Sequence, residues 1–300
     1  MPLLTIGSAA YDTLDTPFGR REKALGGSGV YASFAASFFT ESRLIGVVGG
    51  DWNPEYSELL RSRGVDIEGL EKRPNEKTCY WSGRYFEDMN RRETLCFEGN
   101  VMGKEYVPLV PEKYKKTPYV FLGNGSPKTD MALLDAIERP KLVVADTMNF
   151  YIDSMKDSLL LLLKRIDGLM LNEDEAKMLT GERNALVGAK KLLENGLRFV
   201  LVNRGEYGSV YVSREDLCII PAFPTFAAID PTGAGDSFGG AFMGSLAESD
   251  ELTLESVKKA LLYATVVASL NVEGFSLERF RLVDRAEIDA RVAEFRKMLV

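Results

Sequence analysis

The stretch DPTGAGD at residues 230–236 places a carboxylate directly after a turn that has almost no side chains. If a helix begins near Asp236, the turn formed by Gly233, Ala234 and Gly235 presents free backbone N–H groups and the positive end of a helix dipole, which together favour an anion. A carboxylate beside such an anion hole suits phosphoryl transfer, because it can accept the proton of an attacking hydroxyl group. Alternatively, Asp236 is only an N-cap and the glycines only shape a tight turn.

The residues that follow the acid favour the functional interpretation. The next turns contain Gly239, Gly240, Ala241, Gly244 and Ser245. Side chains this small predict unusually close packing, which would anchor the turn rigidly. A helix cap by itself needs neither two glycines nor a helix of small residues behind it.

The chain contains no histidine among its 300 residues. Ser-His-Asp triads, Cys-His pairs and HExxH zinc sites are therefore excluded. Acid–base chemistry must depend on Asp, Glu, Lys, Tyr or Cys, and a carboxylate is the natural base for a hydroxyl group.

The charge balance limits the partners of the protein. Acidic residues outnumber basic ones by 44 to 37, which gives a net charge of −7, so neither nucleic acid nor a membrane is expected as a partner. A phosphorylated substrate stays open, because a local site can be positive on an acidic protein. The three cysteines show no CxxC spacing and the first residues lack a signal-peptide pattern, so we expect a cytoplasmic protein without disulfides.

Alternating strand and helix patterns predict an α/β fold with a mostly parallel sheet. Helices are expected over residues 28–39 and 57–65, and a β-hairpin over 77–98 with its turn at 87–90. Buried strands are expected at 3–7, 44–49, 119–124, 141–147, 167–172 and 198–205, with antiparallel additions at 207–213 and 218–223. Ligands bind outside the carboxyl ends of parallel strands, where Asn124, Asp146 and Asn172 stand.

The motif DPTGAGDSFGGAF closely resembles the C-terminal signature of the ribokinase-like (PfkB) carbohydrate kinases. GGSG at 26–29 and NEDEAKMLTG at 172–181 occur in the order of that family, so the resemblance covers nearly the whole chain. It implies one three-layer α/β/α domain over residues 1–300, with a small β-hairpin lid formed by about 12–24 and 77–104. It also implies that Asp236 is the catalytic base and that Gly233, Ala234 and Gly235 form the anion hole.

The resemblance further implies a site for Mg-ATP. Asn172 and Glu175 match the family's NxxE element, which organises Mg²⁺ and the nucleotide phosphates, partly through water. Without the resemblance, the same residues indicate only a helix start with acidic residues in its first turn. The NRGEYG stretch resembles the turn that lines the ATP site, which points to Asn203, Gly205 and Gly208. Asp230 and Thr232 match positions that bind a monovalent cation such as K⁺ in many members.

The same register assigns residues to the phosphate acceptor. Asp12 follows the first strand and matches the acid that grips substrate hydroxyls, and Gly26 and Gly27 would let the substrate lie against the backbone. Tyr31 stands where family sugar kinases often have Asn; it either stacks on a base or ring, or belongs to the core. The remaining acceptor candidates are Asn124 at a strand end, and Asn90 and Arg92 near the hairpin turn, which reach the substrate when the lid closes or else face solvent.

The sequence therefore predicts an ATP-dependent phosphotransferase that phosphorylates a hydroxymethyl group of a small sugar or sugar-like molecule. A nucleoside kinase of the same fold, a nucleotide-dependent dehydrogenase and a catalytically silent nucleotide or sugar sensor are the alternatives. The expected partners are ATP and a small-molecule acceptor. The edges of the hairpin either pair across a homodimer or serve as a monomeric lid.

Overall fold

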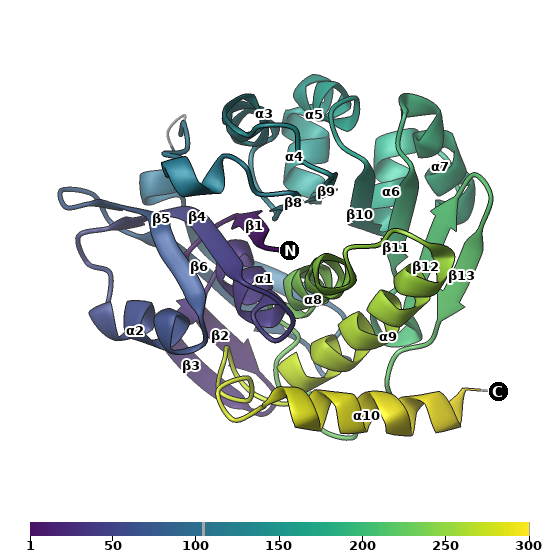
Figure 1. Ribbon diagram of the computed structural model, residues 1–300. Helices are drawn as coiled ribbons and strands as arrows, with labels where there is room; N and C mark the ends of the chain where they lie inside the picture. The colour runs from purple at the N-terminus through teal and green to yellow at the C-terminus, as the bar shows by residue number, and fades with distance from the viewer. Residues whose placement is uncertain (104–105, 300) are drawn as a thin grey trace.

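A large, mostly parallel sheet forms the centre of the molecule (Figure 1). The computed structural model describes residues 1–103 and 106–299. The strands of this sheet are β1 (Leu3–Ile6), β4 (Ser42–Gly49), β5 (Val65–Arg73), β8 (Tyr119–Leu122), β9 (Leu142–Asp146), β10 (Gly168–Asn172), β11 (Phe199–Asn203), β12 (Ser209–Ser213) and β13 (Leu217–Ile220). Their order is β13-β12-β11-β10-β9-β8-β1-β4-β5; the strands from β11 to β5 run parallel, β12 is antiparallel to β11, and β13 is antiparallel to β12.

Helices cover both faces of this sheet, because successive strand residues point to opposite sides. The helices are α1 (Ser28–Ala36), α2 (Pro54–Ser62), α3 (Pro127–Ala136), α4 (Asn149–Ser154), α5 (Lys156–Leu163), α6 (Glu173–Thr180), α7 (Ala185–Leu192), α8 (Ala234–Ser249), α9 (Leu254–Asn271) and α10 (Arg285–Met298). Leu3 packs into one core with α1, α8, α9 and α10, whereas Leu4 packs into the other core with α3, α5, α6 and α7. Short 3-10 helices are η1 (Asn100–Met102), η2 (Glu112–Tyr114), η3 (Leu193–Asn195) and η4 (Gly205–Tyr207). The α/β fold with three layers is confirmed.

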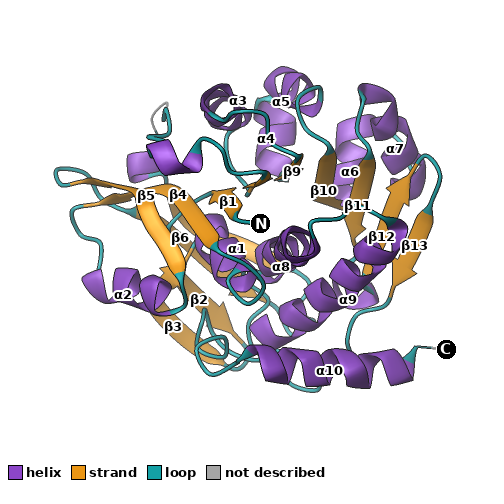
Figure 2. Ribbon diagram, viewed as in Figure 1, coloured by secondary structure: helices purple, strands orange, loops and turns teal. Residues whose placement is uncertain are grey.

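A second, four-stranded sheet lies beside the large one (Figure 2). Its order is β3-β2-β6-β7, formed by β2 (Ala10–Thr16), β3 (Gly19–Gly26), β6 (Cys79–Tyr85) and β7 (Arg92–Glu98). The two segments expected to form the lid thus pair with each other through β2 and β6, which run parallel. Lys104, the last residue of the second segment, lies outside the described residues.

The small residues of α8 allow it to pack closely against α1. A Cβ atom on Gly240 would overlap the backbone of Ala32, and one on Gly239 would overlap the ring of Phe121 on β8. Larger side chains would push α8 away from both neighbours. The close packing expected from the sequence is therefore present, and it fixes the start of α8 at the carboxyl ends of the strands.

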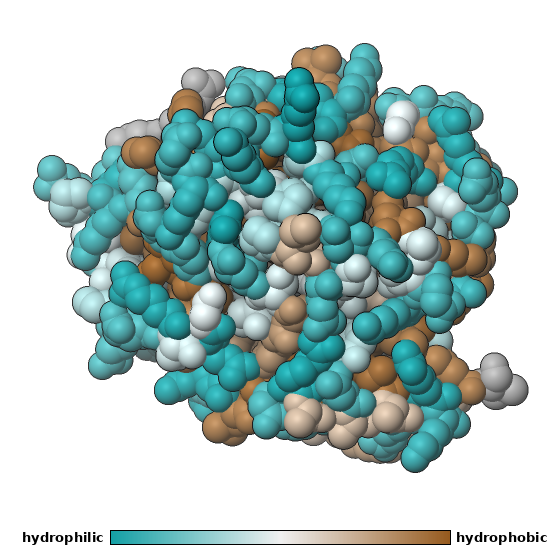
Figure 3. Space-filling model, in the orientation of Figure 1, coloured by the Kyte–Doolittle hydropathy of each residue, from teal (hydrophilic) through white to brown (hydrophobic). Residues whose placement is uncertain are grey.

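The surface is mostly hydrophilic on the face shown in Figure 3, where apolar side chains form separate patches. Within residues 1–103 and 106–299, we find no helix with the length and apolar character needed to cross a lipid bilayer.

Candidate active site

The first turn of α8 carries the acid that the sequence singled out. Gly233 precedes the helix at φ 76°, a left-handed conformation, and a Cβ atom there would overlap the ring of Tyr31. Glycine is thus required at this position for both reasons. No side chain caps the helix, so backbone N–H groups of the turn lack a side-chain partner, and Asp236 stands beside them, half-buried.

Tyr31 lies in the core, only 1% exposed, and forms the floor beneath Gly233. Its hydroxyl group has no hydrogen-bond partner among the described residues. The sequence left open whether Tyr31 stacks on a ligand or belongs to the core, and in the structure it belongs to the core.

Three carboxyl groups interact at this edge of the sheet. Burial raises the pKa of Asp236 to about 6, and the positive charge of Arg92 partly opposes that rise. Burial also raises the pKa of Glu175 to about 7. Asp146, at the end of β9, has a pKa raised well above its usual value by burial and then by the charges of Asp236 and Glu175. Asp146 was noted at a strand end in the sequence but given no role; its place beside Asp236 adds it to the site.

Arg92 brings a positive charge from the small sheet to these acids. Burial alone would lower the pKa of its guanidinium group, but interactions with Tyr85, Asp236 and Glu175 raise it overall. The guanidinium carbon lies 5.6 Å from the centre of the Trp81 ring. The sequence singled out Arg92 by itself; Trp81 and Tyr85 belong to an aromatic stretch, residues 80–86, for which it predicts either closure over the site or pairing with a second subunit.

The start of α6 is built differently from the start of α8. The Asn172 side chain accepts hydrogen bonds of 2.9 Å from the N–H groups of Asp174 and Glu175, and Glu175 accepts one of 2.7 Å from the N–H group of Asn172. This is a capping box. Asn172 and Glu175 therefore cap the start of α6, as the alternative interpretation of the NxxE element expects. Glu175 also interacts electrostatically with Arg92 and Asp146.

The turn after β11 lies next to the start of α6. Asn203 pairs with Asn172 in the parallel register of β10 and β11, so both side chains stand at the same sheet edge. Gly205 and Gly208 have φ angles of 55° and 92°. Between these glycines, Glu206 accepts a 2.9 Å hydrogen bond from the amide of Asn90 at the hairpin tip. The small sheet therefore reaches across to this turn, and Asn90 contacts the turn itself.

Asp12 follows the first strand, as expected, and lies within the next strand, β2. Only 4% of it is exposed, and a Cβ atom on Gly26 would overlap its carboxylate, so the glycine provides the space for the acid. Burial raises its pKa to about 8, with the charges of Asp230 and Asp236 adding to the rise and Arg92 opposing it. Asp12 and Asp236 are thus close enough to interact.

Gly27 and Asn124 meet at the start of α1. Gly27 precedes this helix at φ 102°, and the Ser28 hydroxyl donates a 3.1 Å hydrogen bond to the backbone carbonyl of Asn124. The side-chain oxygen of Asn124 is buried without a hydrogen-bond partner among the described residues. These residues therefore form one wall beside Asp12 and Gly26.

The loop before α8 is fixed by hydrogen bonds. Asp230 is fully buried and accepts bonds of 2.9 Å and 3.2 Å from the N–H groups of Thr232 and Ser276, and burial raises its pKa. The Thr232 hydroxyl donates a 3.1 Å bond to the hydroxyl of Tyr85, which ties the loop to the small sheet. In the part of the chain that the structure describes, no three acidic or cysteine side chains stand close enough to hold a metal ion by themselves.

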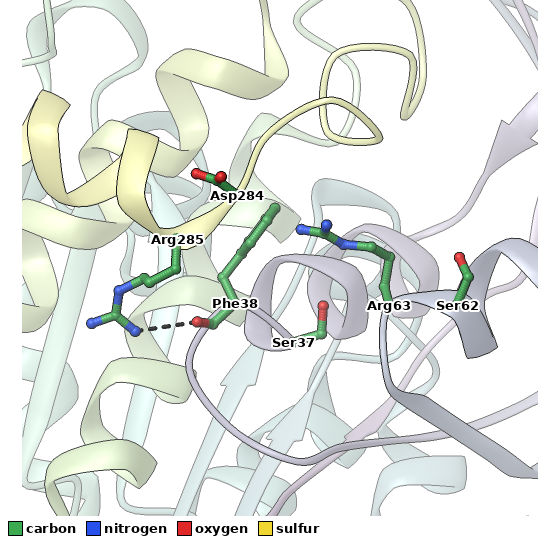
Figure 4. A pocket seen from close by; sticks show the side chains of 6 residues that line it. All are labelled: Ser37, Phe38, Ser62, Arg63, Asp284 and Arg285. Atoms are coloured by element: carbon green, nitrogen blue, oxygen red, sulfur yellow. Dashed lines mark hydrogen bonds between the residues drawn. The ribbon is translucent and has the colours of Figure 1, made fainter.

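A surface hollow of about 270 Å³ lies elsewhere, at the opposite end of α1 from Gly27 (Figure 4). It is lined by Ser37, Phe38, Ser62, Arg63, Asp284 and Arg285. The Arg63 guanidinium stacks on Phe38, and Arg285 donates a 3.1 Å bond to the Phe38 carbonyl. None of the acids described above lines this hollow, so the hollow is separate from their cluster.

Comparisons with known proteins agree with this arrangement. The sequence pattern described as pfkB family carbohydrate kinase matches residues 5–279. A cytidine kinase of Thermococcus kodakarensis is 29% identical, over 87% of this chain and 96% of that protein.

Solved structures show the same fold. The nucleoside kinase of Methanocaldococcus jannaschii, described as an archaeal member of the ribokinase family, superposes with a TM-score of 0.80 at 21% identity, covering 98% of both chains. A double mutant of fructokinase from Vibrio cholerae O395, with fructose, ADP and potassium ion bound, superposes with a TM-score of 0.80 at 17% identity, covering 97% of this chain and 98% of that one. With the family pattern matched over most of its length and the ribokinase fold around an uncapped GAGD helix start, this chain belongs to the pfkB family of carbohydrate kinases and is an ATP-dependent phosphotransferase.

Proposed function

We propose that Asp236 deprotonates a hydroxymethyl group of the acceptor while the amides of Gly233, Ala234 and Gly235 hold the transferring phosphoryl group. The acceptor oxygen forms a bond to the γ-phosphorus, the bond from that phosphorus to ADP breaks, and the proton passes to Asp236. The observation that carries this proposal is the uncapped start of α8 beside a carboxyl group whose pKa is about 6. Such a base is ionised at neutral pH yet basic enough to accept a proton.

The nucleotide is assigned to the ends of β10 and β11, with Asn172, Glu175, Asn203, Gly205 and Gly208 around it. Glu175 and Asp236 raise the pKa of the neighbouring Asp146, and hard oxygen donors of this kind suit Mg²⁺. Because the described side chains form no complete metal cage, Mg²⁺ would be held by the nucleotide phosphates and water, with Glu175 as an outer partner. When bound, Mg²⁺ neutralises phosphate charge.

The acceptor is assigned to the wall formed by Asp12, Gly26, Gly27 and Asn124. Its reacting end points toward Asp236, which interacts with Asp12. Arg92 reaches the same acids from β7, so closure of the small sheet as a lid would deliver a positive charge to the developing phosphate charge and keep water out. The bond between Asn90 and Glu206 supports this role, because it joins the hairpin tip to the nucleotide side.

A nucleoside is the second candidate acceptor, beside a simple sugar. The specific observation in its favour is the cytidine kinase of T. kodakarensis, which resembles this chain over nearly the full length of both proteins. Tyr31 also lies in the core instead of supplying the polar contact that many sugar kinases place there.

Three further assignments accompany this function. Asp230 and Thr232 would bind K⁺ through oxygens of a loop that hydrogen bonds already fix.

A homodimer would form through β7, an edge strand on which Leu95 and Phe97 are 46% and 63% exposed. The cytoplasm suits the three cysteines, all of which are free.

The function is tested by measuring ADP release from Mg-ATP over pentoses, hexoses, their phosphates and nucleosides. Turnover with at least one acceptor is expected, and the product should carry phosphate on a primary hydroxyl group. If no acceptor supports ADP release while the protein still binds nucleotide, the chain would be the silent sensor instead.

A further inference from the structure

Asp130 is a buried acid that the reaction described above does not use. It lies on α3, one turn beyond Asn124 and Gly125, and only 2% of it is exposed. Among the described residues, no hydrogen bond or neighbouring charge offsets the burial of its carboxyl group. Burial, the only cause acting on it, raises its pKa well above the usual value. Burial thus favours the protonated form of the carboxyl group, which presents one O–H donor next to one carbonyl acceptor.

Two neighbours connect this acid to the acceptor wall. An atom at the Cβ position of Gly125 would lie 3.8 Å from Asp130 Oδ1, so the carboxyl group lies against the backbone that follows Asn124. The Tyr151 hydroxyl interacts electrostatically with both Asp130 and Cys79, and Cys79 in turn interacts with Asp12. Burial raises the pKa of Tyr151 to about 12, so the phenol is also neutral.

The cluster combines polar groups without partners and a flat aromatic surface. Asn124 Oδ1 is buried without a hydrogen bond, and the ring of Tyr151 packs edge-on against Phe150 at 5.2 Å. A buried polar group without a partner is unfavourable unless a ligand supplies the missing hydrogen bond. A ligand that satisfies these groups needs a donor and an acceptor side by side on the rim of a flat, uncharged ring. The heterocyclic base of a nucleoside has that edge.

We propose that Asp130, with Tyr151 and Asn124, forms a subsite that binds the base of a nucleoside acceptor. This inference rests on the proposed kinase function and selects the nucleoside over the free sugar. The ribose would lie against Asp12 and Gly27 with its hydroxymethyl group at Asp236, and the base would extend past Asn124 to Asp130. Asp130 is a specificity-determining residue here and takes no part in proton transfer.

Two substitutions at one position test the neutral hydrogen-bonding role. Asp130→Asn keeps a donor beside an acceptor, whereas Asp130→Leu keeps the branched shape of the side chain and neither polar group. Steady-state kinetics would be measured with cytidine, uridine, adenosine and inosine, and with ribose as the acceptor that lacks a base. We expect Asp130→Leu to raise KM for the preferred nucleoside by roughly 5–100-fold, while Asp130→Asn retains most of the affinity. Neither variant should change kcat/KM for ribose.

Asp135→Leu is the matched control, because Asp135 stands on the same helix with its side chain 70% exposed and ion-paired to Arg165. It should leave all kinetic constants unchanged. If Asp130→Leu does not fold, Tyr151→Phe replaces it, since that change removes only the phenol oxygen and should raise KM for the nucleoside several-fold.

The outcomes separate the subsite from the kinase itself. A wild-type enzyme that phosphorylates only free sugars, or an Asp130→Leu variant with normal KM for nucleosides, would overturn the subsite and leave the kinase function standing. Loss of affinity in Asp130→Asn equal to that in Asp130→Leu would also overturn it, because it would mean that the group binds as an anion. Absence of turnover with every acceptor would instead overturn the proposed function.

Discussion

Two helix starts at the same sheet edge carry an acid in their first turn and use it in opposite ways. At α6, the side chains of Asn172 and Glu175 bond to the backbone N–H groups of their own helix. At α8, the residue before the helix is Gly233, which has no side chain to cap anything, and Asp236 stands beside N–H groups that no side chain caps. The first start is capped by its own side chains, whereas the second has no side-chain cap and the Ala234 N–H group donates a 3.1 Å bond to the Pro231 carbonyl.

The difference shows why an acid near a helix start says little by itself. Asn172 satisfies the backbone and so stabilises the protein, with Glu175 turned toward Arg92 and Asp146. Gly233 has no side chain that could cap α8, and it adopts its left-handed conformation without strain because it has no Cβ atom. A start without a cap, fixed by close packing against α1, is the one suited to bind a phosphoryl group that comes and goes.

The largest expected effect is at the uncapped start. Asp236→Asn removes the proposed base but keeps the size of the side chain, so kcat should fall by roughly 10²–10⁴-fold. Binding of ADP, measured by calorimetry, and the free energy of unfolding should stay close to wild type. A variant with a near-normal rate would show that the carboxylate of Asp236 is not the base.

The next effect concerns the glycine that replaces a cap. Gly233→Ala forces a Cβ atom into the ring of Tyr31 and a left-handed φ on alanine, so it should destabilise the fold by about 2–4 kcal/mol. Urea denaturation measures this loss.

Gly235→Ala is the matched comparison, because a Cβ atom at Gly235 would meet nothing within 4 Å. It should preserve or slightly raise stability, since alanine favours the helix, while its methyl group enters the space assigned to the phosphoryl group and lowers kcat. Equal loss of stability in both variants would contradict the distinction between a strained and an open glycine.

The same comparison explains what could be predicted from the sequence. The GAGD motif and the strand ends identified the fold and the position of Asp236, because glycine spacing and β-branched runs are local signals. The capping box at Asn172 was an open alternative, since the same residues serve either purpose until the distances are known. Asp146 and Asp130 gained meaning only from the charges and the burial that the folded chain places around them. That Asp12 lies within a strand could not be predicted locally, because β2 pairs on one side with β6, which comes much later in the chain.

A smaller effect tests how the small sheet tunes the base. Asp236 acts only when ionised, so kcat/KM should fall as the pH drops through about 6. Arg92 lowers the pKa of Asp236, so Arg92→Met should move this acidic limb to higher pH as well as reduce the rate. Arg91→Met is the control, because Arg91 is 76% exposed and ion-paired with Asp88 at 2.6 Å. A pH profile that is identical in the Arg92 variant and wild type would place Arg92 away from Asp236.

The smallest effect separates capping from nucleotide binding at the satisfied helix start. Asn172→Ala removes the cap of α6, and Asn184→Ala removes the cap of α7, where the Asn184 side chain likewise accepts from two backbone N–H groups. Each substitution should reduce the free energy of unfolding by about 1 kcal/mol, since the lost hydrogen bonds are alike. Only Asn172→Ala should also raise KM for Mg-ATP, because Asn172 pairs with Asn203 at the end of β11, within the proposed nucleotide site. If the two variants matched in both stability and KM, Asn172 would be a helix cap and nothing more, and the nucleotide would have to be held by Asn203 and the glycine turn that follows it.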